Sequence, residues 1–305
     1  MAALQAASGH NNFNGTYNPE IWSPKLLVKF YNTTIFKVIA NTKYEGDIKN
    51  QGDTVKIRNT PTVAIKDYIK GQTLETEHLQ TSVIDLEINQ AKYFRFLAED
   101  VDTLQSNIDY VEDWTRDAAK QMQIEIDSDI LADIFDDAHA SNQGLAAGLV
   151  SGGYNMGVSG TPLQVTKSTI VDKIIEMGAI LDEQNVPVTD RFLLLPPQFC
   201  ALIKQSDLNK ANEAGDAESM RRHGVLGTIA RFTIYETNQL STTLDTNTIT
   251  NIIFGQKEAL TFASQLTKSR SKEADNQFGM INDGLNVFGY KVIKPEALGW
   301  AYLYI

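Results

Sequence analysis

The stretch TSVIDLEINQAKYFRF, residues 81–96, alternates apolar and polar side chains as a β-strand does. Its length is the strongest constraint on the fold, because an ordinary strand holds about five or six residues. Sixteen extended residues at about 3.3 Å each would span roughly 50 Å. Gln90 and Lys92 interrupt the apolar face in the middle of the stretch. We therefore predict a strand that leaves the body of the protein, with these two residues where neither face meets the chain's own core.

The segment before it, GDTVKIRNTPTVAIKDYIKGQ at residues 52–72, alternates in the same way and is interrupted by Pro61. Proline is tolerated on exposed edge strands and at bulges, so we predict a strand that is not centrally paired along its whole length. Residues 71–80 form a polar tip between the two segments. Together they predict a long projecting hairpin. The alternative is two shorter strands joined by a bulge inside a conventional sheet.

Residues 100–138 change to a helical period, with apolar residues at steps of three and four and neither glycine nor proline. Asp102 or Thr103 is a suitable N-cap for this helix. About 35 residues at 1.5 Å each predict a rod near 50 Å, roughly three times the usual helix length. The predicted buried face of the helix consists of Leu104, Ile108, Val111, Trp114, Met122 and Ile126.

A glycine-rich segment, residues 141–162, is the predicted boundary between this helix and a mixed region. Beyond it, the pattern predicts helices over residues 170–181 and 197–203 and strands over residues 191–195, 230–236, 250–255 and 300–305. Residues 1–19 and 207–224 are polar and lack core-forming side chains, so we expect a mobile arm and a mobile loop there. The predicted fold class is α+β.

The chain has 305 residues and a formal net charge of −11, from 38 acidic and 27 basic residues. This acidity disfavours tight wrapping of nucleic acid. No run approaches the roughly 18 apolar residues of a membrane helix. Residues 1–19 have neither the basic start nor the apolar centre of an export signal, so we expect synthesis in the cytoplasm. Cys200 is the single cysteine, which excludes an intrachain disulfide framework.

The sequence holds no plausible catalytic constellation, and we predict no cofactor and no metal. Ser159 in GVSGT comes close to the GxSxG elbow of hydrolases, but Thr161 replaces the final glycine. Cys200 lies in an apolar helical segment without a nearby histidine, which favours a core residue over a nucleophile. An acidic cluster follows the long helix and is more typical of a solvated face than of a cation site; it comprises Asp133, Asp136, Asp137 and His139. A hydrolase that uses Ser159 or this cluster is the alternative of a different class.

The order of these elements resembles the major capsid protein of tailed bacteriophages, which has the Hong Kong 97-type capsid fold. The specific likeness runs from residues 52–72 through TSVIDLEINQAKYFRFLAEDVD at residues 81–102, which resemble the extended loop and the start of the spine helix of phage coat proteins. The resemblance implies an α+β fold with a long β-hairpin extended loop, a long spine helix and a mixed α/β axial domain.

The resemblance also implies how the chain divides. The expected units are an N-terminal arm and short helix at residues 1–45, the extended loop at 46–100, the spine helix and linker of the peripheral domain at 101–164, the axial domain at 165–265, and return strands of the peripheral domain at 266–305. The loop would lie over an adjacent subunit, with contacts from Tyr68, Lys70, Gly71, Glu77 and His78. Some relatives weld their shells through a loop lysine, but no partner residue for Lys66 or Lys70 is identifiable, so that chemistry is not carried over.

As a function, the resemblance implies a subunit without enzymatic activity that assembles with itself into the pentamers and hexamers of an icosahedral phage head. The head would enclose double-stranded DNA without sequence-specific binding. The implied partners are a scaffolding protein, a portal and a decoration protein, with no membrane, and the implied location is the virion capsid. An encapsulin-like compartment for a cargo enzyme is the alternative within the same fold.

Overall fold

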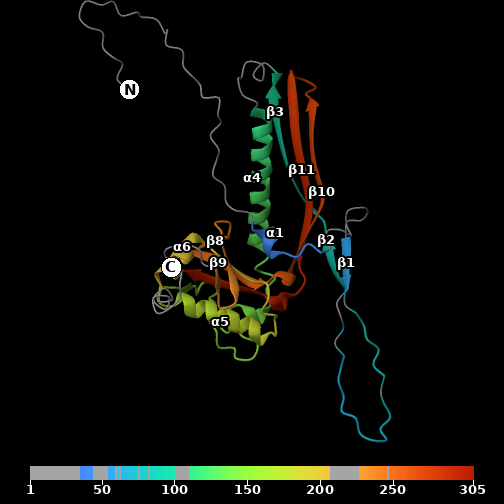
Figure 1. Ribbon diagram of the computed structural model, residues 1–305, viewed down its shortest axis with the longest axis vertical. Helices are drawn as coiled ribbons and strands as arrows, with labels where there is room; N and C mark the ends of the chain where they lie inside the picture. Colours follow the sequence, from blue (N-terminus) through green and yellow to red (C-terminus); the bar gives the residue numbers. More distant parts are fainter. Residues whose placement is uncertain are drawn as a thin grey trace, which may run out of the picture.

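The computed structural model describes residues 35–43, 54–58, 61, 63–74, 76–81, 83–100, 110–206, 227–245 and 247–305. Figure 1 shows a long upright sheet beside a long helix, a lower body of mixed sheet and helices, and a loop that leaves both of them. The predicted arm at residues 1–19 and the predicted loop at residues 207–224 lie outside the described residues.

The upright body is a three-stranded antiparallel sheet with a helix along one face. Its strands, in spatial order, are β10 (Leu260–Glu273), β11 (Gly279–Val292) and β3 (Gln90–Glu99), and the helix is α4 (Tyr110–Asp133). β10 and β11 form a hairpin whose pairing starts with Leu260 opposite Val292. β3 adds to the other side of β11, so a segment far away in sequence completes the sheet.

The lower body is built on a seven-stranded sheet in the order β4-β12-β9-β5-β7-β6, with β8 paired to β9. The strands are β4 (Leu163–Gln164), β5 (Arg191–Leu195), β6 (Thr228–Ile229), β7 (Phe232–Glu236), β8 (Thr242–Asp245), β9 (Asn247–Gln256) and β12 (Leu298–Tyr304). The other elements are helices α5 (Ile170–Glu183) and α6 (Pro197–Gln205) and the short turns η1 (Ala140–Asn142), η3 (Lys257–Ala259) and η4 (Pro295–Ala297). The predicted elements of this region are present, and every residue of β5 is buried, as its unbroken apolar run predicts.

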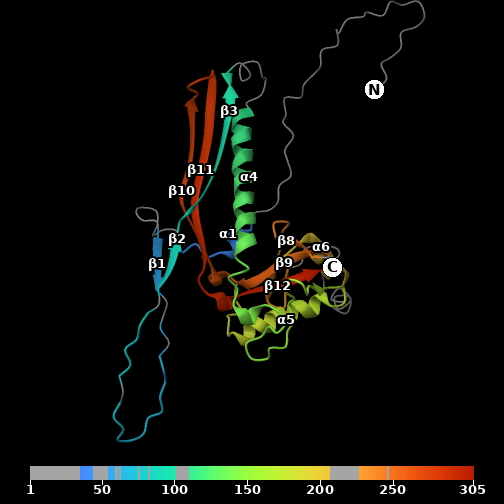
Figure 2. The same ribbon diagram turned by 180° about the vertical axis from the view of Figure 1, so that it is seen from behind.

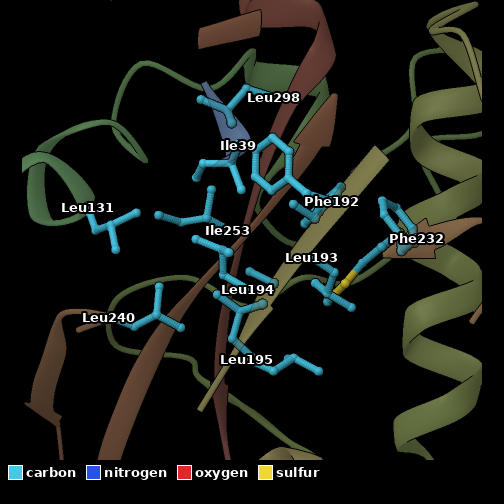
Figure 3. Close-up of a cluster of buried hydrophobic side chains, with 14 of the residues drawn as sticks. Ile39, Leu131, Phe192, Leu193, Leu194, Leu195, Phe232, Leu240, Ile253 and Leu298 are labelled. Carbon is cyan, nitrogen blue, oxygen red and sulfur yellow. The ribbon is translucent and has the colours of Figure 1, made fainter. Parts of the chain in front are cut away.

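One apolar core joins the two bodies. Figure 3 shows side chains of β5 lying with Phe232 and Ile253 of the neighbouring strands. Leu131 of α4 and Ile39 of the short helix α1 (Phe36–Ile39) belong to the same buried cluster. The C-terminal end of the long helix is therefore fixed in the core, while its other end extends along the upright sheet.

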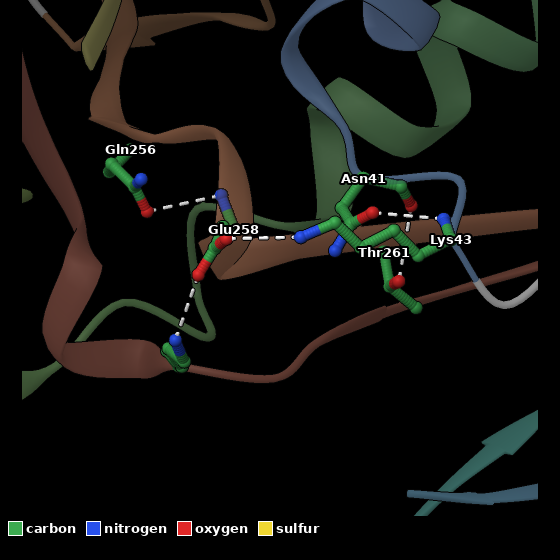
Figure 4. A network of polar contacts seen from close by, with 6 residues as sticks. Asn41, Lys43, Gln256, Glu258 and Thr261 are labelled. Carbon is green, nitrogen blue, oxygen red and sulfur yellow. Dashed lines mark hydrogen bonds and ion pairs between the residues drawn. The ribbon is translucent and has the colours of Figure 1, made fainter. Parts of the chain in front are cut away.

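Polar contacts hold the chain at the junction between the lower sheet and the upright sheet. The Glu258 carboxylate lies 3.2 Å from Nζ of Lys43 and 3.1 Å from Nζ of Lys294 (Figure 4). The hydrogen bonds from these ammonium groups, Lys294 first, lower the pKa of Glu258. The carbonyl of Asn41 accepts the N–H of Phe262 at 3.1 Å, so the segment after α1 is tied to the start of β10.

The stretch at residues 81–96 is two strands, so the prediction of one continuous strand is wrong. β2 (Val83–Glu87) pairs with β1 (Thr54–Arg58), whereas β3 begins at Gln90 and pairs with β11. The chain changes partner at Ile88, which is 7% exposed. This buried side chain therefore marks the junction between the two sheets.

The ladder between β1 and β2 extends only from Thr54 opposite Glu87 to Arg58 opposite Val83. The described residues between 61 and 81 carry no strand and project away from both bodies (Figures 1 and 2). The predicted projection is present, but the long ladder is not. Apolar side chains in this segment meet no core of their own chain, and Pro61 lacks the N–H that a ladder requires.

The described part of α4 departs from the predicted helix at its buried face. Leu104 and Ile108 lie outside the described residues. Ile126 is 4% exposed, whereas Trp114 is 46% exposed, so Trp114 is not the buried anchor that the spacing predicts. The core reaches only the C-terminal part of α4, because the lower body ends there (Figure 1). Val111 and Met122 are partly buried.

The long helix also ends earlier than predicted. Regular helix stops at Asp133, and residues 134–137 are turns. Acidic residues at positions 133, 136 and 137 oppose the helix dipole, which favours cations at a C-terminus. The N–H of Ala138 bonds the carbonyl of Phe135, in the shorter spacing of a turn.

The resemblance implied that residues 266–305 are return strands of the sheet beside the long helix. This expectation is wrong for β12. This strand pairs with β9 and β4 in the lower sheet, while β10 and β11 form the upright sheet. The glycine-rich segment contributes to the same body, because Met156 is fully buried and its carbonyl accepts the N–H of Tyr302 at 2.7 Å. Aromatic residues of β12 pack on one another and on the turn after α4: the ring centroid of Trp300 is 5.8 Å from that of Tyr302 and 5.2 Å from that of Phe135.

Ile130→Ala should destabilise the unassembled subunit by about 2–5 kcal/mol, because the side chain is fully buried and its removal leaves a cavity. Trp114→Ala, at a half-exposed position of the same helix, should cost less. Urea denaturation followed by circular dichroism measures both losses. A larger loss for Trp114→Ala than for Ile130→Ala would contradict the structure.

Candidate functional site

The projecting loop, defined as residues 61–81, exposes large apolar side chains. The exposed fraction is 93% for Ile65, 71% for Ile69 and 73% for Leu74. Apolar side chains exposed singly are common, but a group of them on one projecting segment marks an interaction site. The loop is therefore the first candidate for the functional surface.

Local backbone chemistry shapes the tip of this loop. The N–H of Gln72 donates to the carbonyl of Ile69 at 3.0 Å, and Gly71 between them has a φ of 89°. Glycine adopts this left-handed conformation without the steric cost that a Cβ brings. Farther from the tip, the Glu77 carboxylate accepts the N–H of Ala64 at 3.2 Å and links the two limbs.

The predicted contact residues gather in this loop and are all exposed: Tyr68, Lys70, Gly71, Glu77 and His78. Sequence reasoning missed Ile65, Ile69 and Leu74, which are at least as exposed as Tyr68 at 69%. Ile65 and Ile69 were interpreted as part of an alternating strand, and Leu74 lies in the segment interpreted as a polar tip. In the structure, no part of the described chain covers these side chains.

A small apolar cluster holds the base of the loop against the upright sheet. Ile57 of β1, Leu86 of β2 and Ile88 are buried together with Ala263 of β10. The backbones also approach closely, since a Cβ at Gly289 of β11 would lie 2.1 Å from the carbonyl oxygen of Glu87. The loop is thus anchored rigidly at its base and free of its own body at its tip.

Between β3 and α4 lies a polar layer that explains the interrupted alternation. Lys92 forms an ion pair with Asp129 of α4 and lies 3.8 Å from Glu125 one turn away. The hydrogen bond to Asp129 is the main cause of the raised pKa of Lys92. Gln90 and Lys92 therefore lie in a polar layer against the helix, so the prediction of a strand that leaves the body of the protein at these residues is wrong.

Tyr290 extends this layer toward the core. Its hydroxyl donates to Asp133 at 2.8 Å and accepts from Nε2 of Gln90 at 3.3 Å. Burial, followed by the bond to Asp133, raises the pKa of Tyr290 to about 12. At the other end of the layer, the ring of Phe96 meets Trp114 edge-on, with centroids 6.0 Å apart.

Asp127 attaches the segment around α1 to the long helix. Its Oδ2 accepts the backbone N–H groups of Ile35 at 2.7 Å and Phe36 at 3.2 Å. The residue is 6% exposed, and desolvation raises the pKa of its carboxyl despite these hydrogen bonds. The chain at Ile35 and Phe36 is therefore attached to α4 by a buried acid.

The candidate nucleophiles lie in a core position and in an exposed turn. Cys200 is 1% exposed, and burial raises the pKa of its thiol to about 12. Ser159 is exposed in the turn between Val158 and Thr161. No group of side chains within the described ranges is arranged to hold a metal ion.

The acidic cluster after α4 is also accounted for by contacts within the chain. Asp137 lies 4.0 Å from Nζ of Lys291, and Nδ1 of His139 accepts the N–H of Ser141 at 3.2 Å.

Among the helices that the structure describes, none combines the length and hydrophobicity needed to cross a membrane.

Comparison with known families decides what this architecture is. A model of the family described as phage capsid protein matches residues 80–301, which is most of the chain. The chain belongs to the phage capsid protein family. A comparison with curated proteins found no match. The matched span starts where the projecting loop returns to β2, so the loop itself lies largely outside it.

Solved phage structures share the fold of this capsid protein. A chain from Mycobacterium phage Che8 is 24% identical with a TM-score of 0.76, and the match covers 95% of this chain and 98% of that one. The capsid structure of the cyanophage P-SCSP1u gives 16% identity and a TM-score of 0.76 over 99% of both chains. The capsid of a native GTA particle gives 10% identity and a TM-score of 0.65, covering 99% of this chain and 100% of that one.

These matches confirm the expected Hong Kong 97-type capsid fold. The protein is a structural subunit of a virion capsid and not an enzyme, which agrees with the roles found for Cys200 and the acidic cluster. The hydrolase alternative is therefore wrong.

Asp127→Asn should remove a pH-dependent loss of stability. The folded protein raises the pKa of the Asp127 carboxyl above its ordinary value of about 4. In wild type, the protonated carboxyl therefore makes its full contribution to the free energy of unfolding below that ordinary value, and this contribution is lost as pH rises through the folded pKa. The variant keeps an acceptor oxygen but no charge, so its free energy of unfolding should increase relative to wild type across that rise. Urea titrations at several pH values measure the difference. A difference that stays constant, or that grows toward low pH, would contradict the assignment.

Proposed function

We propose that this capsid protein assembles with copies of itself into the pentamers and hexamers of an icosahedral phage head that encloses double-stranded DNA. The observation that carries the proposal is the projecting loop, which runs away from both bodies of the chain and exposes its apolar residues Ile65, Ile69 and Leu74. A surface of this kind gains stability only against another molecule. A contact between two different patches of identical subunits repeats around a ring and closes it.

In this proposal the loop lies over an adjacent subunit, with Tyr68, Lys70, Gly71, Glu77 and His78 among its contacts. The lower body, which contains most of the expected axial domain at residues 165–265, gathers around the five-fold and six-fold axes. The upright sheet and α4 form the peripheral part of each ring. Each individual contact can be weak, because every subunit makes several of them.

The charge of the chain fits an enclosing wall. The net charge of −11 disfavours general attraction to the phosphate backbone, which suits a wall that encloses DNA without wrapping it. In this proposal the wall makes no sequence-specific contact with the DNA. The proposal also includes synthesis in the host cytoplasm and three partner proteins: a scaffolding protein, a portal and a decoration protein. They rest on the family resemblance.

Electron microscopy of the purified protein, expressed alone and with its candidate scaffold, tests the assembly directly. We expect closed shells of uniform diameter with five-fold and six-fold clusters. Compact monomers or dimers under all conditions would reject the proposed function.

Deletion of residues 70–80 should leave a folded subunit that assembles poorly, since the base of the loop is held by β1, β2 and the cluster around Ile88. Circular dichroism and thermal melting measure folding, and sedimentation measures shell yield. A matched control is Val150→Ser, which removes an 82% exposed apolar side chain from the glycine-rich segment, outside the loop. Normal shells from the deletion variant would contradict the intersubunit role of the loop.

A further inference from the structure

The segment that contains β8 and β9 is almost free of charge. Residues 237–256 hold a single charged side chain, Asp245, whereas charged residues make up 21% of the whole chain. The Oδ2 atom of Asp245 accepts the N–H of Gly160 at 2.8 Å, so this carboxylate is bonded within its own chain. A surface of this composition can meet another copy without the repulsion that a net charge of −11 otherwise brings.

A cavity opens between the start of α6 and the hairpin formed by β8 and β9. Its volume is about 590 Å³, and its lining includes Pro197 and Phe199 of α6 together with Thr242 and Thr248 of the hairpin. None of the described side chains that line it is charged. The cavity therefore suits an apolar side chain that is flanked by hydrogen-bonding groups.

Leu244 of β8 lies beside this cavity and is 82% exposed. It pairs with Thr248 across the hairpin, while Thr242 pairs with Thr250. Cross-strand partners and residues two apart on a strand share a face, so Leu244 lies on the same face as these three threonines. All three threonines line the cavity. We call Leu244 and the cavity the β8 surface.

Helix α5 presents a second exposed apolar side chain. Ile174 is buried in the core, whereas the next residue, Ile175, is 54% exposed. Asp172 and Ala179 lie three residues before and four residues after Ile175, so they are its neighbours on the outer face of the helix. We call this group the α5 surface. It combines an apolar side chain with a carboxylate one turn away.

The two surfaces lie on different sides of the lower body. In both views β8 lies on the side toward the upright sheet and α5 on the opposite side (Figures 1 and 2). When copies gather around an axis, each copy turns one side to the neighbour ahead and another side to the neighbour behind. Two different patches of identical subunits then meet at every contact of the ring.

We propose that the β8 surface of one copy receives the α5 surface of the next copy in the ring. Ile175 enters the cavity beside Leu244, and the Asp172 carboxylate accepts hydrogen bonds from the rim groups of Asn247 and Thr248. This inference rests on the proposed function. It adds a contact between lower bodies that does not involve the projecting loop.

Opposite charges introduced at the two positions test the contact. Leu244→Asp and Ile175→Lys should each lower the shell yield by about tenfold or more, because each buries an unpaired charge at every contact of the ring. A chain with both changes brings opposite charges together and should recover the yield to within about threefold of wild type. Sedimentation measures the yield, and circular dichroism should show an unchanged fold since both side chains are exposed.

Val150→Asp is the matched control, because Val150 is also 82% exposed and lies in the glycine-rich segment of the same body. This variant should assemble as wild type does. Wild-type yield from both single variants, or no recovery in the double variant, would overturn the proposed contact while leaving the proposed shell intact. A wild-type protein that forms no shells would overturn both.

Disulfide trapping gives a second readout that does not depend on yield. A disulfide requires Cα atoms within about 7 Å, so a chain with both Leu244→Cys and Ile175→Cys should link neighbouring copies in oxidised shells. A non-reducing gel should show a ladder of oligomers that ends at the hexamer, while each single variant stays monomeric. The native Cys200 does not interfere because it is buried. Monomers alone, or no species beyond the dimer, would overturn the proposal.

Discussion

Burial of Ile88 is the contact on which the rest of the architecture depends. This side chain lies in a cluster with Ile57, Leu86 and Ala263, and it marks the point where the chain passes from the small β1–β2 ladder to the upright sheet. Because the cluster joins the loop base to β10, the direction of the loop is set by the sheet. A loop anchored in this way presents its apolar residues away from its own core, where only another molecule can cover them.

The long helix is held on the sheet by two kinds of contact. Its C-terminal part is buried in the common core through Ile130 and Leu131, while its middle is joined to β3 by the ion pair between Lys92 and Asp129. Half-exposed ion pairs contribute little net stability, so they orient the helix more than they stabilise it. The upright body is therefore firm at the junction with the lower body and less strongly held toward Trp114.

Sequence periodicity predicted the elements whose environment is uniform. The unbroken apolar run of β5 predicted a buried strand, and the apolar spacing of α5 predicted a helix against one continuous core. Both elements are present. The same reasoning failed where the environment changes along a segment. Residues 81–96 alternate across two sheets, and Trp114 keeps helical spacing beyond the end of the core. The group of charged side chains on the outer face of the upright sheet was not predicted, because Arg95, Lys268 and Asp283 become neighbours only through strand pairing.

The central claim is that the loop between β1 and β2 is stabilised by another copy of the chain. Hydrogen exchange of the backbone amides at residues 63–81 tests it most directly, by comparing unassembled subunits with intact shells. In the subunit these amides have few backbone partners, so they should exchange rapidly; in shells their exchange should slow by about tenfold or more, since a neighbour excludes water from them. Equal exchange in the two states would contradict the account.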